Sequence, residues 1–188
     1  MIAIPQPAMA LNAHDAPGAH YRMYNSWEVP ETATPREIVA WVASVAGQTP
    51  ERYLKGLVIN CHGNYEMGDD GKEVGGFGLA LGRGIYLGDV PTFAGLRGKV
   101  SSIWITACGA ARMGRKGNVH GNGHALCSGL ARAAGCIVIA GTQFQEASWV
   151  LPRNHIDDFE GLVVLYDRSG DMVWSRRYGY MMPHLSFD

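Results

Sequence analysis

Three short apolar runs constrain the fold of this 188-residue chain more than any other feature of its sequence. They cover residues 56–61, 100–106 and 136–140, and each is too short for a core helix. Continuous apolar runs of this length are typical of strands that are buried on both faces, as in parallel sheets. The sequence therefore predicts a central sheet that other elements cover.

Helical patterns separate these runs. Thr34, Pro35 and Glu37 form a helix start with a capping box, and Gly47 is expected to end that helix. Further helices are predicted over residues 89–96 and 125–134, the latter closed by Gly135, and further strands over 19–25, 161–166 and 172–176. Residues 64–88, with eight glycines, are expected to form a loop. Strands that alternate with helices predict a three-layer α/β/α sandwich with a mostly parallel sheet.

The organisation expected is an irregular N-terminal arm over residues 1–18, rich in alanine and proline, followed by one domain over residues 19–188. The net charge of −1 excludes a strongly basic surface, so neither nucleic acid nor a membrane is expected as a partner. No apolar run is long enough to predict a membrane span. Four cysteines without a Cys-x-x-Cys pair favour a reduced, cytoplasmic protein.

A histidine and a cysteine follow directly after two of the predicted strands. His62 and Gly63 end the first run, and Cys108 lies two residues after the second. In open parallel sheets, ligands bind beyond the carboxyl ends of the strands. If the two strands are neighbours, the imidazole and the thiol lie within reach of each other at that edge.

This pair of residues has the chemistry of nucleophilic catalysis. A cysteine attacks as its thiolate, and a free thiol has a pKa of about 8.5, so an adjacent histidine is needed to take the proton. The same histidine can then protonate the leaving group. The backbone N–H groups of Gly63 and Cys108 are the candidates for an oxyanion hole, since glycine allows a carbonyl to approach closely.

Residues 57–63 (LVINCHG) and 103–109 (IWITACG), with the histidine 46 positions before the cysteine, resemble the caspase-like clan of cysteine peptidases. The resemblance implies a caspase-like fold and a peptidase that acts on a protein or peptide without a cofactor or metal. It implies His62 and Cys108 as the catalytic pair and the amides of Gly63 and Cys108 as the oxyanion hole.

The resemblance also implies where the side chain preceding the scissile bond would bind. Thr106, two residues before the nucleophile, and Gln143 and Glu146, after the next strand, are the candidates. The family's caspases have glutamine at the position of Thr106, so strict aspartate specificity is not expected, and Glu146 could favour a basic side chain. The basic, glycine-rich loop that contains Arg112, Arg115 and Lys116 lies where family members are cut during maturation, and is a candidate processing site.

Other functions remain open at this stage. A catalytically inactive binding or scaffold module could keep the same fold, whereas an α/β-hydrolase is disfavoured because its histidine would follow the nucleophile. A zinc site at His120, His124 and Cys127 is conceivable, but solvated histidines in a glycine-rich loop are the simpler interpretation. Cys61, Cys127 and Cys136 are expected in the core. The oligomeric state and any third catalytic residue stay undetermined.

Overall fold

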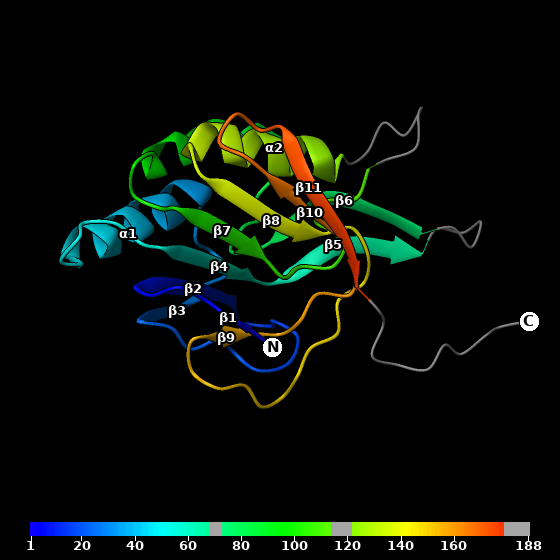
Figure 1. The fold of residues 1–188 in the computed structure, drawn as a ribbon, viewed down its shortest axis with the longest axis horizontal. Coiled ribbons are helices and arrows are strands. Elements are labelled where there is room, and N and C mark those ends of the chain that lie inside the picture. The colour runs from blue at the N-terminus through cyan, green and yellow to red at the C-terminus, as the bar shows by residue number, and fades with distance from the viewer. Residues whose placement is uncertain (68–72, 114–121, 179–188) are drawn as a thin grey trace, which may run out of the picture.

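A seven-stranded sheet is the centre of the molecule, seen here in a computed structural model that describes residues 1–67, 73–113 and 122–178 (Figure 1). The strand order is β11-β10-β8-β7-β4-β2-β3. Five neighbouring strands are parallel, and β10 and β11 are antiparallel to their neighbours, which confirms a mostly parallel sheet. The strands are β2 (Ala8–Ala13), β3 (Asn25–Val29), β4 (Gly56–Asn60), β7 (Ser102–Ile105), β8 (Ile137–Gly141), β10 (Gly161–Tyr166) and β11 (Met172–Tyr178).

The helices are α1 (Pro35–Gln48), the 3-10 helix η1 (Leu87–Leu96) and α2 (Gly123–Ala134). At the start of α1, the Glu37 N–H donates to the Thr34 hydroxyl at 3.3 Å and the Thr34 N–H donates to the Glu37 carboxylate at 2.8 Å, which confirms the capping box. This helix continues one residue beyond Gly47. Gly135 ends α2 with a φ of 63°, the left-handed conformation that glycine adopts without strain.

Alternate residues of the strands face two separate cores. Leu57 and Ile59 of β4 pack in the larger core with α1, η1 and α2, whereas Val58 packs in the smaller core on the opposite face. Figure 1 shows the helices along one side of the sheet, with β1 (Ile2–Ala3) and β9 (His155–Ile156) on the other. Of the three layers expected, the described residues contain one helical layer, because the segments between β2 and β3 and between β8 and β10 are loops rather than helices.

The N-terminal segment departs from the prediction. Residues 1–18 were expected to form an irregular arm, but residues 8–13 form β2, which is buried along its whole length and pairs with both β3 and β4. Its sequence, AMALNA, contains no β-branched residue, so its local propensity for a strand is weak. The strand expected over 19–25 is also absent there, since β3 begins only at Asn25. Pairing with neighbouring strands, rather than local propensity, determines where β2 and β3 lie in the chain.

The glycine-rich segment after His62 is not the loop that was expected. It contains β5 (His62–Met67) and β6 (Glu73–Ala80), which pair as an antiparallel hairpin outside the main sheet. Glycine weakens a strand by its conformational entropy, but the backbone ladder needs no side chain. This hairpin extends β4 beyond the sheet edge, so His62 lies at the junction between the two. None of the helices in the described ranges has the length and apolar character to cross a membrane.

Candidate functional site

The chain segments after β4 and β7 meet at one edge of the sheet. The two strands are parallel neighbours, with Ile59 opposite Ile105 in the register. Beyond them, Gly63 lies directly against Cys108: a Cβ atom added to this glycine would be 1.8 Å from the Cys108 carbonyl oxygen. The two strands are therefore neighbours and the segments after them touch, whereas the reach of the imidazole to the thiol stays a prediction.

His62 is exposed at the first position of β5, whereas the preceding residue, Cys61, is fully buried in the helix-side core. The strand alternation thus places the two side chains on opposite faces, as expected. Among the described residues, no group hydrogen-bonds to the His62 imidazole, and the imidazole is not within hydrogen-bond distance of the Cys108 sulfur. Catalytic hydrogen bonds are often long in the absence of substrate and shorten when it binds.

The Cys108 thiol is half-buried and held by the loop after β8. The backbone N–H of Gln145 donates to its sulfur at 3.3 Å, and the thiol faces the carbonyl oxygen of the same residue at 3.6 Å. Burial raises the pKa of Cys108, and the charge of Glu160 raises it further, whereas the N–H groups of Gln145 and Cys108 lower it. The resting state therefore favours the thiol, and a proton acceptor is needed to form the thiolate.

The two candidate oxyanion donors are brought together by the same contact. Because the backbone of Gly63 touches that of Cys108, their N–H groups belong to adjoining segments at the sheet edge. The next amide along the chain, that of Gly109, is already used: it donates to the Gln143 carbonyl at 2.8 Å. Gly109 has a φ of 62°, which allows the chain to turn sharply after the nucleophile.

The three candidate residues for substrate binding have different surroundings. The Thr106 hydroxyl donates to the Ile59 carbonyl at 3.2 Å and also interacts with the Tyr21 hydroxyl. The Gln143 side chain packs on Gly161, and its buried oxygen has no hydrogen-bond partner among the described residues. The Glu146 N–H donates to the Glu160 carboxylate at 3.0 Å. All three thus belong to segments that border Cys108.

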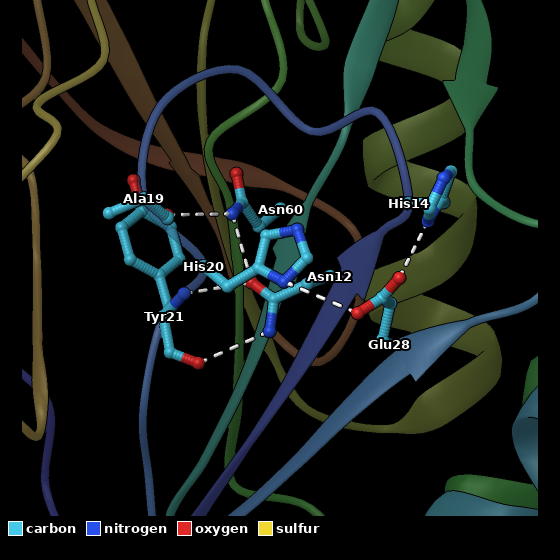
Figure 2. Close-up of polar contacts among 7 residues, drawn as sticks. All are labelled: Asn12, His14, Ala19, His20, Tyr21, Glu28 and Asn60. Carbon is cyan, nitrogen blue, oxygen red and sulfur yellow. Dashed lines mark hydrogen bonds and ion pairs between the residues drawn. The ribbon is translucent and has the colours of Figure 1, made fainter.

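A buried network of asparagines fixes the edge of the sheet beneath the site (Figure 2). Asn60, the last residue of β4, donates to the Asn12 side-chain oxygen of β2 at 2.9 Å. The Asn12 amide in turn bonds the backbone N–H and carbonyl of Tyr21, at 2.9 and 3.1 Å. Both asparagines are 2% exposed, and their satisfied hydrogen bonds hold the 14–24 loop against the end of β4, just before His62.

Glu28 forms a hydrogen bond with His14 and a longer ion-pair contact with His20, as Figure 2 also shows. The His14 Nδ1 lies 2.6 Å from one carboxylate oxygen, and the His20 Nδ1 lies 3.8 Å from the other. The hydrogen bond with Glu28 raises the pKa of His14, and the same bond lowers the pKa of Glu28. This group is exposed and makes no contact with Cys108.

Sequence reasoning missed the residues behind the nucleophile. Glu160 is 4% exposed, and its backbone exchanges hydrogen bonds with the buried Gln145 side chain, at 3.1 Å in both directions. Tyr21 is buried above Thr106 and interacts with the backbone N–H of Asp157. No local pattern marks these residues, because their burial results from two loops that fold over the helix-free face of the sheet.

Further sequence predictions concern the remaining cysteines, a metal site and the candidate processing loop. Cys61, Cys127 and Cys136 are free and buried, which confirms their expected core positions. The described residues contain no cluster of three or more potential metal ligands, and His120 lies outside the described ranges. Arg115 and Lys116 lie outside them too, whereas the backbone of Arg112 bonds Gly109 and Gly123.

Comparisons with models of protein families, with curated proteins and with solved structures give no match.

Proposed function

We propose that this protein is a cysteine endopeptidase of the caspase-like type, with Cys108 as the nucleophile and His62 as the general base and acid. The observation that supports this most is the backbone contact between Gly63 and Cys108. Through this contact, the His-Gly segment and the Ala-Cys-Gly segment form one surface at the carboxyl ends of two parallel strands, although they are distant in the sequence.

The reaction follows from the positions of these groups. His62 accepts the thiol proton as the Cys108 sulfur attacks the carbonyl carbon of the substrate. The N–H groups of Gly63 and Cys108 stabilise the oxyanion of the tetrahedral intermediate. His62 then returns the proton to the leaving amine as the C–N bond breaks, which leaves a thioester on Cys108. Water attacks the thioester with His62 as the base, and the released thiolate regains its proton.

The partly buried thiol makes His62 essential in this scheme. Burial and the charge of Glu160 both raise the pKa of Cys108, so the free thiol is a poor nucleophile by itself. Substrate that enters between the 143–146 loop and His62 would replace the Gln145 contacts to the sulfur and bring the imidazole and the thiol into hydrogen-bond distance.

The experiment is covalent labelling with peptide acyloxymethyl ketones, which alkylate an activated cysteine after the peptide has bound. The proposal predicts that wild-type protein is labelled at Cys108 and that Cys108→Ala is not labelled, while its circular dichroism spectrum stays unchanged. The three buried cysteines are an internal control, since mapping by mass spectrometry should find no label on them. Labelling that persists in Cys108→Ala would contradict the proposal.

A second candidate is an inactive scaffold with this fold. The raised pKa of Cys108 and the absence of a hydrogen bond between its sulfur and His62 in the described residues favour it. It predicts that every peptide probe reacts with Cys108 no faster than simple iodoacetamide does. A preference for peptide probes of 100-fold or more, on the order of what positioning and general-base catalysis supply, would exclude the scaffold.

A further inference from the structure

A buried carboxylate lines a cavity beside the candidate nucleophile. Glu160 directly precedes β10, and its side chain is 4% exposed. It lines a cavity of about 360 Å³, together with three further acidic residues of the loop between β8 and β10, Glu146, Asp157 and Asp158. The cavity is therefore negatively charged, and Glu160 is its most buried acid.

Among the described residues, only one of the four carboxylates in this cavity has a cationic partner. Asp158 pairs with the amino group of Met1. No lysine, arginine or histidine among the described residues forms an ion pair with Glu160, Asp157 or Glu146. Burial raises the pKa of Glu160 to about 7, and the charges of Glu146 and Asp157 contribute in the same direction. A buried carboxylate in these surroundings is stabilised when a cation enters.

Two consecutive backbone N–H groups contact this carboxylate and the nucleophile. The Glu146 N–H donates to Glu160 Oε2 at 3.0 Å, and the preceding residue, Gln145, donates its own N–H to the Cys108 sulfur at 3.3 Å. The charge of Glu160 is close enough to raise the pKa values of both Cys108 and the Tyr21 hydroxyl. Glu160 thus lies behind Cys108, on the same face of the sheet as Tyr21 and Thr106.

On the basis of the proposed peptidase function, we propose that Glu160 is a specificity-determining residue that selects substrates with lysine or arginine before the scissile bond. An ammonium or guanidinium group in the cavity gives Glu160 the cation that the described residues do not supply. A neutral side chain there leaves the carboxylate unpaired, and an acidic one adds like charge to the four carboxylates. From the sequence alone, a preference for a basic side chain was assigned only to Glu146, which is less buried.

The test compares four peptide acyloxymethyl ketones that differ only in the residue before the reactive group: arginine, lysine, norleucine and aspartate. Norleucine keeps the aliphatic chain of lysine without its charge. Second-order rates of Cys108 alkylation are measured for wild type, for Glu160→Gln, which keeps the side-chain shape, and for Glu51→Gln. Glu51 is an exposed residue that, within the part of the chain that the structure describes, pairs only with Lys55, at 3.8 Å, so it is the matched control.

The proposal predicts that wild type and Glu51→Gln react with the arginine and lysine probes at least 30-fold faster than with the norleucine probe, and slowest with the aspartate probe. In Glu160→Gln, the ratio of the arginine or lysine rate to the norleucine rate should fall at least about ten-fold; the ratio is taken within each variant, because loss of the Glu160 charge also changes the pKa of Cys108 and so the rate of every probe. If Glu160→Gln does not fold, Glu160→Asp, which withdraws the carboxylate by one methylene, should reduce the preference at least about five-fold.

Two outcomes overturn the proposal and are distinguishable from each other. If the norleucine or aspartate probe reacts with Cys108 as fast as the arginine probe, or if Glu160→Gln keeps the full preference, the specificity assignment is wrong and the peptidase function stands. If no probe labels Cys108, both the peptidase function and the specificity assignment are wrong.

Discussion

Substituting alanine for Gly63 would place a methyl carbon 1.8 Å from the carbonyl oxygen of Cys108, and 2.8 Å and 3.0 Å from its carbonyl carbon and nitrogen. Each of these neighbours is backbone, so no side-chain rotation can relieve the overlap. Contact without severe overlap requires about 3 Å, so the two segments must separate by about 1 Å or more. That separation moves His62 and the Gly63 N–H away from the nucleophile.

The expected effect on activity is large, since a misplacement of about 1 Å in a catalytic arrangement can lower the rate about 100-fold. Overpacking of this kind also destabilises a protein by about 1–3 kcal/mol. The assay is the rate at which the best peptide ketone alkylates Cys108, measured together with urea unfolding. Gly63→Ala should lose about 100-fold in rate under conditions in which the protein remains folded.

Gly47→Ala is the matched control for this substitution. Gly47 lies near the end of α1, and an added Cβ there has no neighbour within 4 Å. Replacement of a helical glycine by alanine stabilises by about 0.5–1 kcal/mol, so this variant should unfold at slightly higher urea with an unchanged alkylation rate. A Gly63→Ala protein that keeps both its stability and its alkylation rate would refute the contact on which the site depends.

Three further predictions follow from the described contacts, and a fourth follows from the sequence of the basic loop. Asn60→Ala should lower the free energy of unfolding by about 0.5–1.5 kcal/mol, measured with urea, because it removes the buried hydrogen bond to the Asn12 side-chain oxygen, which then accepts only from the Tyr21 N–H among the described residues. The pKa of Glu160 is raised to about 7, so its side chain becomes charged as the pH rises from 6 to 8. The ratio of the arginine probe rate to the norleucine probe rate should therefore increase over this range in wild type. In Glu160→Gln the ratio should stay constant. Thr34→Ala should cost about 1 kcal/mol of stability through loss of the capping box and leave labelling unchanged. If the basic loop over residues 112–117 is a processing site, intact-mass analysis should show cleaved wild type and uncleaved Cys108→Ala; identical, uncut masses in both would discard that site.

The strands that carry the candidate pair could be predicted because their sequence and their environment agree. The runs that become β4, β7 and β8 are apolar, as a strand covered on both faces requires, and His62 and Cys108 follow directly after two of them. The caps of α1 and α2 were also predictable, since Thr34, Glu37 and Gly135 act through local backbone geometry.

The parts that could not be predicted depend on pairing with distant segments. Half of the residues of β2 are alanine, and its burial comes from two neighbouring parallel strands that local propensity does not reveal. The β5–β6 hairpin contains many glycines and is held by its backbone ladder. Glu160 precedes an apolar strand, where an acidic residue is ordinarily exposed, and only the fold of the 142–160 loop buries it.

The most direct test of the central claim, that His62 and Cys108 act as one catalytic unit, is the rate of Cys108 alkylation by the best peptide ketone in His62→Ala. His155→Ala is the matched control, because the ring of His155, a residue of β9, bonds only the Arg153 carbonyl among the described residues, at 3.0 Å. Loss of general-base catalysis should lower the rate by about 10²- to 10⁴-fold in His62→Ala and leave it unchanged in His155→Ala. A His62→Ala protein that is alkylated as fast as wild type would contradict the account.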